Sequence, residues 1–105
     1  SMVTEAVLIG DRRKFLSALI TVDPDVAKQL DSGKAAHESD AVRKHLQTVI
    51  DDVNTQVAKV ETIKRFTVLP RQLTIEDGEL TPTLKVKRNK VNEHFADAIE
   101  AMYAD

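Results

Sequence analysis

Cysteine is absent from this 105-residue sequence, and glycine and proline occur only three times each. Without cysteine, the chain can form no disulfide, no thiolate metal site and no cysteine nucleophile. Aromatic residues make up 4% of the sequence, and no stacking platform for nucleic-acid bases is recognisable. The formal net charge is −2, whereas nucleic-acid binding requires a clustered basic excess. Nucleic acid is therefore not an expected partner.

Long hydrophobic runs are missing as well. No segment resembles a signal peptide, and no apolar run is long enough to span a bilayer. We therefore expect a cytoplasmic location and no transmembrane segment, with peripheral membrane contact left open. The three histidines are far apart and lack metal-ligand spacing, so we predict no metal site and surface positions for His37, His45 and His94.

The remaining composition is that of one globular domain. Apolar residues make up 42% of the chain and charged residues 30%, which suits a single soluble domain with a modest core. We interpret residues 1–2 as a remnant of cloning and residues 3–105 as the domain itself. Val3 enters an apolar run almost at once, so the natural chain is expected to extend upstream.

The first third of the chain predicts a hairpin and a short helix. Apolar runs at residues 6–9 and 15–22, joined by a short polar link, predict two paired strands that are buried on both faces. Asp23 and Pro24 are typical of a helix start, and Ser32-Gly33 is typical of a helix end.

An apolar stripe marks a long second helix that opens at Ser39 and Asp40. The stripe predicts about five or six helical turns. Its members are Val42, Leu46, Val49, Ile50, Val53, Val57 and Val60. Because valine has a mediocre helix propensity, burial must hold this helix together. In residues 63–69, apolar Phe66 and Val68 alternate with polar neighbours, and the pattern ends at Pro70. This predicts a third strand, half-buried or at a sheet edge.

Two further elements complete the predicted fold. Asp77-Gly78 is a turn signal and predicts a hairpin between residues 74–75 and 80–81. An apolar stripe over residues 89–103 predicts a last helix. Together the elements predict an α+β fold, in which a small sheet is covered by helices and an irregular basic segment precedes the last helix.

This basic segment holds the best candidate for chemistry, Lys85. On composition alone, Lys85 is a solvated charge within a basic run. Pro82, however, fixes its own backbone and restricts Thr81, and both Thr81 and Thr83 offer local hydrogen bonds. A stiff, hydrogen-bonded loop of this kind can aim the long cationic side chain of Lys85 at an anion.

The segment 80–88, with the sequence Leu-Thr-Pro-Thr-Leu-Lys-Val-Lys-Arg, resembles the C-terminal signature of adenylate-forming enzymes, in the form found in long-chain fatty acyl-CoA synthetases. The resemblance covers nearly the whole chain, including residues 64–70 and the Asp77-Gly78 turn. It implies the small, mobile C-terminal domain of a fatty acid–CoA ligase, whose large N-terminal adenylation domain lies outside this chain. The most widespread form of the signature has glycine at the position of Leu84, and we interpret the leucine as a feature of the long-chain branch.

The resemblance also implies a reaction and a role for Lys85. Enzymes of this family convert a fatty acid and ATP, with Mg²⁺, to an acyl-adenylate and pyrophosphate, and then transfer the acyl group to coenzyme A with release of AMP. The matching lysine is catalytic in the family, so Lys85 is implied to stabilise charge on the α-phosphate during adenylation. The small domain then rotates and withdraws this lysine. Thr81, Pro82, Thr83 and Arg88 would support the Lys85 segment.

Other basic residues have competing interpretations. Arg88 lies near a helix start, where a cation is mildly unfavourable, and we weigh a surface charge equally against a contact with an acidic residue of the missing domain. Arg12, Arg13 and Lys14 form a basic hairpin tip that could meet the phosphates of coenzyme A, although a solvated turn is the preferred interpretation.

The rest of the family's active site would lie in the large domain, which carries the phosphate-gripping loop, the ribose-binding acidic residue and the acyl tunnel. We therefore expect this chain alone to have no ligase activity and no strong affinity for ATP. The alternative is a stand-alone α+β binding module that presents its basic loop to an anionic ligand or an acidic partner.

Overall fold

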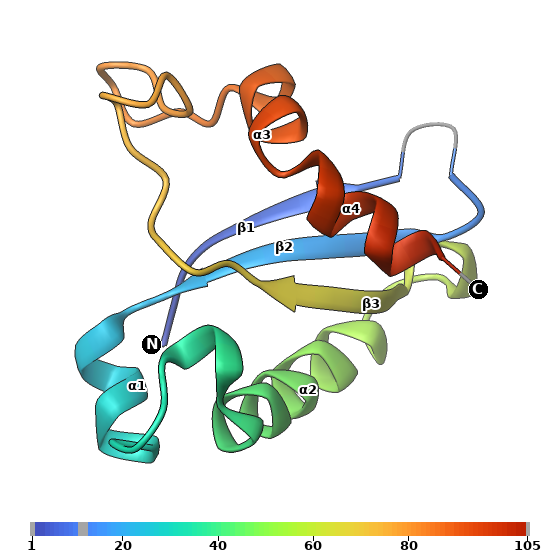
Figure 1. The fold of residues 1–105 in the computed structure, drawn as a ribbon. Helices are drawn as coiled ribbons and strands as arrows, with labels where there is room; N and C mark the ends of the chain where they lie inside the picture. The colour runs from blue at the N-terminus through green and yellow to red at the C-terminus, as the bar shows by residue number, and fades with distance from the viewer. Residues whose placement is uncertain (1, 11–12, 105) are drawn as a thin grey trace.

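The computed structural model describes residues 2–10 and 13–104, and within them it forms a three-stranded sheet (Figure 1). β1 (Val3–Ile9) and β2 (Leu16–Val22) pair as an antiparallel hairpin. β3 (Ile63–Val68) lies parallel to β2, and the strand order is β1-β2-β3. The predicted hairpin and the predicted edge strand are therefore both confirmed.

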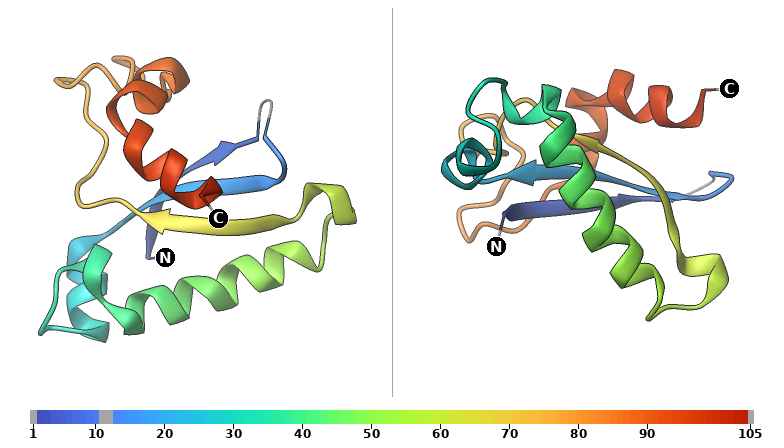
Figure 2. Two further views of the ribbon diagram at one scale, coloured as in Figure 1. Left: turned by 45° about the vertical axis from the view of Figure 1, so that its right-hand side comes forward. Right: turned by 90° about the horizontal axis from the view of Figure 1, so that it is seen from below.

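Helices cover both faces of the sheet, which confirms the α+β class (Figure 2). Four helical segments connect β2 to β3: α1 (Pro24–Leu30), the 3₁₀ turn η1 (Ala36–Glu38), α2 (Asp40–Asn54) and the 3₁₀ turn η2 (Lys59–Glu61). α1 and α2 lie on one face, whereas α3 (Arg88–His94) and α4 (Ala96–Tyr103) lie on the other. The long connection between β2 and β3 is what allows these two strands to run parallel.

The central strand β2 is buried on both faces, as predicted. Ala18 and Ile20 pack in the core under α1 and α2, whereas Leu19 packs in the second core under α3 and α4. The same prediction is wrong for β1, because its buried residues Val7 and Ile9 face only the second core and Leu8 is 44% exposed.

Both predicted helix starts are confirmed by capping hydrogen bonds. Oδ1 of Asp23 accepts from the backbone N–H of Asp25 at 2.9 Å. Oγ of Ser39 accepts from the backbone N–H of Val42 at 3.2 Å. These side chains satisfy backbone donors that have no partner in the first turn of a helix.

The predicted length of α2 is wrong, because the helix ends at Asn54. The side chain of Asn54 pairs with the backbone of Ile63: its Nδ2 donates to the carbonyl at 2.9 Å, and its Oδ1 accepts from the N–H at 2.8 Å. This clamp joins the end of α2 to the start of β3. Val57 and Val60 consequently lie outside the helix, and Val60 is 87% exposed.

The C-terminal third differs from its prediction in two places. Gly78 does form a turn with a φ of 78°, but the residues on either side of it form no strand within the described chain; Leu80 instead bridges to Val86. The predicted last helix is two helices that meet at Phe95, whose φ of −117° and ψ of 27° leave the helical range. The ring of Phe95 lies under the guanidinium of Arg71, 4.9 Å from its centroid, which holds the ring at this break.

Candidate functional site

Lys85 lies in an exposed loop closed by its own hydrogen bonds, which we term the lysine loop (residues 80–86). The backbone N–H of Thr81 donates to the carbonyl of Lys85 at 2.8 Å. Oγ1 of Thr81 accepts from the backbone N–H of Lys85 at 3.0 Å and lies 3.0 Å from Oγ1 of Thr83. Thr81 therefore fixes the backbone of Lys85 from both sides, with Pro82 between the two threonines stiffening the turn.

The Lys85 side chain is exposed and makes no ion pair or hydrogen bond within the described chain. Its neighbour Leu84 has a φ of 67° and is 64% exposed. This left-handed conformation is unfavourable for leucine and free of penalty for glycine. The geometry thus gives a physical reason why a glycine can occupy this place in the signature.

A buried carboxylate lies at the base of the lysine loop. The side chain of Glu79 is 0% exposed. It accepts hydrogen bonds from Nη1 and Nη2 of Arg71 at 2.8 and 2.6 Å and from the backbone N–H of Thr74 at 3.2 Å. Nδ1 of His94 lies 2.8 Å from the same carboxylate, and because the carboxylate only accepts, this nitrogen donates.

These contacts set the ionisation of Glu79. Hydrogen bonding from Arg71 is the largest cause of the change, with His94 and Thr74 adding to it, and together they lower the pKa of Glu79 to about 2 despite its burial. Arg71 also lies 3.3 Å from a carboxylate oxygen of Asp77. Glu79 is thus a buried anion at neutral pH, held by the segment after β3, by the turn and by α3.

Sequence reasoning missed Glu79, which directly follows the Asp77-Gly78 turn signal. Its side-chain partners Arg71 and His94 are eight and fifteen residues away along the chain, so no local pattern marks the contact. His94 was predicted as a surface histidine; its side chain is 30% exposed, yet its ring pairs with this buried anion.

Arg88 begins α3 and donates from Nη2 to the backbone carbonyl of Leu8 in β1. This bond ties the helix start to the edge strand β1, while the residue as a whole is exposed. The other N–H groups of the guanidinium stay available, so a contact with another domain stays a prediction. Lys90 lies 3.9 Å from Glu93, one turn further along the helix. The support that Arg88 gives to Lys85 stays a prediction.

The basic hairpin tip is only partly described, since Arg12 lies outside the described residues. Arg13 is exposed and also contacts α4: it pairs with Glu100 at 2.5 Å, and its guanidinium stacks over the ring of Tyr103 at 4.8 Å. Lys14 has interaction partners as well, and a role of these residues toward coenzyme A stays a prediction.

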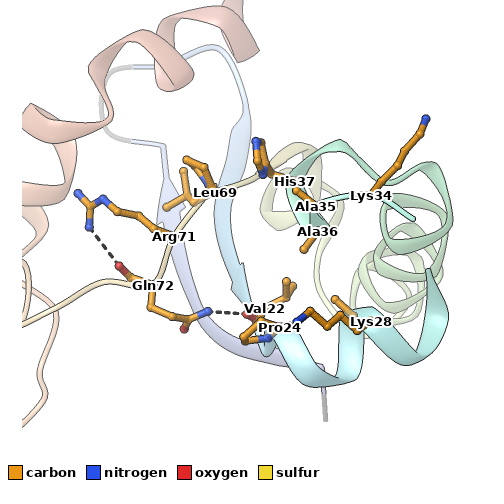
Figure 3. A pocket seen from close by; sticks show the side chains of 12 residues that line it. Val22, Pro24, Lys28, Lys34, Ala35, Ala36, His37, Leu69, Arg71 and Gln72 are labelled. Carbon is orange, nitrogen blue, oxygen red and sulfur yellow. Dashed lines mark hydrogen bonds between the residues drawn. The ribbon is translucent and has the colours of Figure 1, made fainter. Parts of the chain in front are cut away.

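Two cavities of about 280 Å³ each lie on the described part of the chain. Arg13 and Arg88 line one of them together with Asn92 and Glu100, so the structure brings these two predicted residues to one place, without Lys85 among the lining residues. The other lies between the start of α1, the loop before α2 and the segment after β3 (Figure 3). Its inner wall is largely apolar, and Lys34 points away from it.

The described residues include no group of three or more His, Cys, Asp or Glu side chains that could hold a metal ion. Within the same residues, no helix has the length and apolar character needed to cross a membrane.

The fold and the lysine loop together define a small α+β domain of the adenylate-forming type. A family model described as the AMP-binding enzyme C-terminal domain matches residues 1–105, and the chain belongs to this family. The resemblance drawn from residues 80–88 is thereby confirmed, and the alternative of a stand-alone binding module gains no support.

Curated relatives point in the same direction. The chain is 38% identical to the long-chain-fatty-acid–CoA ligase FadD15 of Mycobacterium tuberculosis, over 97% of its own length and 18% of the relative. It is 34% identical to the peroxisomal long chain acyl-CoA synthetase 7 of Arabidopsis thaliana, over 98% of its own length and 16% of the relative. The chain thus spans less than a fifth of these proteins.

Solved structures share the fold. The adenylation domain of a carboxylate reductase from Mycobacterium chelonae superposes with a TM-score of 0.82 at 25% identity, over 99% of this chain and 16% of that one. The A-PCP didomain of a carboxylic acid reductase from Segniliparus rugosus, in complex with AMP, gives a TM-score of 0.78 at 22% identity, over 97% of this chain and 14% of that one.

Proposed function

We propose that this chain is the C-terminal domain of a long-chain fatty acid–CoA ligase, and that Lys85 is its catalytic contribution. The observation that carries the proposal is the lysine loop: an exposed lysine without an internal partner in the described chain, presented by a hydrogen-bonded turn whose sequence matches the family signature. The names of the curated relatives supply the substrate class, a long-chain fatty acid.

The chemistry that Lys85 performs is stabilisation of an anionic transition state. In adenylation, a fatty acid carboxylate attacks the α-phosphate of ATP and pyrophosphate leaves. Negative charge grows on the phosphate oxygens, and a positioned ammonium group lowers the free energy of this state and holds the carboxylate in line. In the second half-reaction, the thiol of coenzyme A loses its proton and attacks the acyl carbonyl carbon, the carbon–oxygen bond to AMP breaks, and AMP leaves as an anion. Phosphorus itself is not attacked in this step, so the transition state that Lys85 stabilises in adenylation does not form.

The remaining partners of the reaction lie outside this chain. The N-terminal adenylation domain of the same protein holds the nucleotide, the acyl chain and the Mg²⁺ that accompanies ATP. We propose that Lys85 enters that site for adenylation and leaves it for thioester formation, and that the ligase works in the cytoplasm. The 105-residue chain alone then has no ligase activity.

The test is Lys85→Ala in the full-length ligase, with the two half-reactions measured separately. The rate of adenylation, measured by ATP–pyrophosphate exchange, is expected to fall about 10²- to 10³-fold. Losses of this size occur when one preorganised hydrogen-bond donor to a transition-state anion is removed. Thioester formation from supplied acyl-adenylate is expected to stay near the unmodified rate.

The matched control is Lys87→Ala, which removes an exposed lysine two residues away. Neither half-reaction is expected to change in this variant. Equal loss of both half-reactions in Lys85→Ala, or undiminished adenylation, would overturn the proposal.

A further inference from the structure

We propose that Glu79 is a positioning residue for Lys85, because its buried carboxylate fixes the base of the lysine loop to the body of the domain. This inference rests on the proposed function of Lys85. Glu79 touches no substrate in the proposed mechanism and acts only through the loop that follows it.

The first observation is where the carboxylate is held. Its two oxygens receive both terminal nitrogens of Arg71, Nδ1 of His94 and the backbone N–H of Thr74, at 2.6 to 3.2 Å. Arg71 follows β3, His94 ends α3, and Thr74 opens the turn before the loop. A single buried side chain therefore joins three segments that surround the base of the lysine loop.

The second observation is what the backbone of Glu79 holds. Its N–H donates to the carbonyl of Thr74 at 3.1 Å, and its carbonyl accepts from the N–H of Lys87 at 2.7 Å. The chain leaves for the lysine loop at Glu79 and returns at Lys87. The same residue thus fixes both ends of the loop relative to the sheet.

The third observation is that the outer part of the loop is bonded to itself. The hydrogen bonds of the tip join Thr81 to Thr83, Leu84 and Lys85, all within the loop. Leu80 and Val86 pack against the core under α3 and α4 at the base. The direction in which the tip points is therefore set at this base, where the Glu79 contacts supply the directional bonds.

Stability alone does not account for a carboxylate in this position. Removing an ion from water is unfavourable even after the protein relaxes, and apolar residues of similar size often fill a core as well. The four directional hydrogen bonds are what a carboxylate adds. A catalytic side chain displaced by about 1 Å can lose about 10²-fold in rate, so the direction of the loop matters for Lys85.

The test is Glu79→Gln in the full-length ligase, with both half-reactions measured as for Lys85→Ala. We expect adenylation to fall about 10-fold or more through kcat, with little change in KM for ATP. Thioester formation from supplied acyl-adenylate is expected to stay within about twofold. In a Lys85→Ala background, Glu79→Gln is expected to cause no further loss, since its effect passes through the lysine.

The matched control is Asp31→Asn, the same chemical change at a carboxylate beside α1. Asp31 accepts from Oγ of Ser39 at 2.7 Å and from the backbone N–H of Gly33 at 3.0 Å. This variant perturbs two hydrogen bonds of a carboxylate away from the lysine loop. The ratio of the two half-reactions is expected to stay unchanged in it.

A second variant, Arg71→Lys, covers the case in which Glu79→Gln does not fold. This variant keeps a cation beside Glu79 but removes the bidentate hydrogen bonds that Arg71 donates to the carboxylate. The selective loss of adenylation is expected here in the same direction and to a smaller extent.

Two results would overturn the positioning role: equal loss of both half-reactions in the folded variants, or a further loss on top of Lys85→Ala. These results are distinct from failure of the proposed function, which shows as undiminished adenylation in Lys85→Ala itself. Loss in Lys85→Ala together with full activity of Glu79→Gln would remove the positioning role and leave the catalytic lysine standing.

Discussion

Two arginine–glutamate pairs stabilise the C-terminal half of this domain, and they share their chemistry. Arg71 meets Glu79 at 2.6 Å, and Arg13 meets Glu100 at 2.5 Å. In both pairs, the guanidinium also lies over an aromatic ring, 4.9 and 4.8 Å from its centroid. Geometry alone would rank them as equals.

Burial separates the two pairs. Glu79 is 0% exposed, whereas Glu100 is 65% exposed. The two arginines are similarly exposed, at 41% for Arg71 and 31% for Arg13, so the carboxylates make the difference. A contact of an exposed carboxylate is screened by water and salt and contributes little, whereas a buried carboxylate depends on its hydrogen-bond donors for compensation. The fold therefore depends more on the pair at the base of the lysine loop than on the pair at the hairpin tip, which is an accessory contact.

The largest expected effect on stability comes from Glu79→Gln, and it depends on pH. At neutral pH, the variant is expected to lower the free energy of unfolding of the 105-residue chain by about 1–3 kcal/mol, as for a buried hydrogen-bonding group that loses its charged partner. The pKa of Glu79 is about 2 in the fold against an ordinary 4.5, so its contribution is complete above about pH 4.5. It is lost as the pH falls through about 2.

Chemical denaturation of both chains between pH 7 and pH 2 checks this prediction. The difference between unmodified chain and variant should shrink between about pH 4.5 and pH 2, as the carboxylate is protonated. Arg71, Asp77 and His94 are the charged or titratable neighbours of Glu79, and Arg71 and His94 lose their anionic partner in the variant. A difference that stays constant down to pH 2 would contradict a folded-state pKa near 2.

The sequence was sufficient for features whose signals are local. The hairpin, both helix caps and the edge position of β3 follow from apolar runs, from Asp23 and Ser39, and from Pro70. The predictions were wrong where contacts between residues far apart in the sequence determine the bounds of an element. The end of α2 is set by Asn54 binding Ile63, a contact that an apolar stripe cannot reveal.

The candidate site shows the same division. Thr81 and Pro82 mark a stiff loop before Lys85 in the sequence itself, and the loop has the expected local hydrogen bonds. Glu79 carries no such mark, because its burial results from how the segment after β3 and the end of α3 meet around it. The residues of the loop itself were enough to predict the structure of its tip, whereas the role of Glu79 at its base could be seen only in the tertiary structure.

An intermediate effect is expected at Leu84, within the lysine loop but away from both pairs. A φ of 67° costs a non-glycine residue about 1–2 kcal/mol. Glycine avoids this cost, but its more flexible unfolded chain lowers the stability of the fold by about 0.5–1 kcal/mol. Leu84→Gly is therefore expected to stabilise the chain by up to about 1 kcal/mol, measured by thermal unfolding. Gly78→Ala, at a φ of 78° with open space around the added carbon, is the reverse control and should destabilise it. Destabilisation by Leu84→Gly would show that the leucine side chain makes a contact worth more than its strain.

The smallest effect is expected for Glu100→Gln, which removes the charge of the exposed pair. Hydrogen bonding to Arg13 lowers the pKa of Glu100, but the carboxylate is open to water and the pair is screened. The stability of this variant is expected to lie close to that of the unmodified chain at neutral pH, and the remaining difference should vanish as salt is added. Thermal unfolding at low and high ionic strength measures both. A loss of stability as large as that of Glu79→Gln, or one that persists in high salt, would contradict this prediction. It would mean that burial of the carboxylate does not decide how much each arginine–glutamate pair contributes to stability.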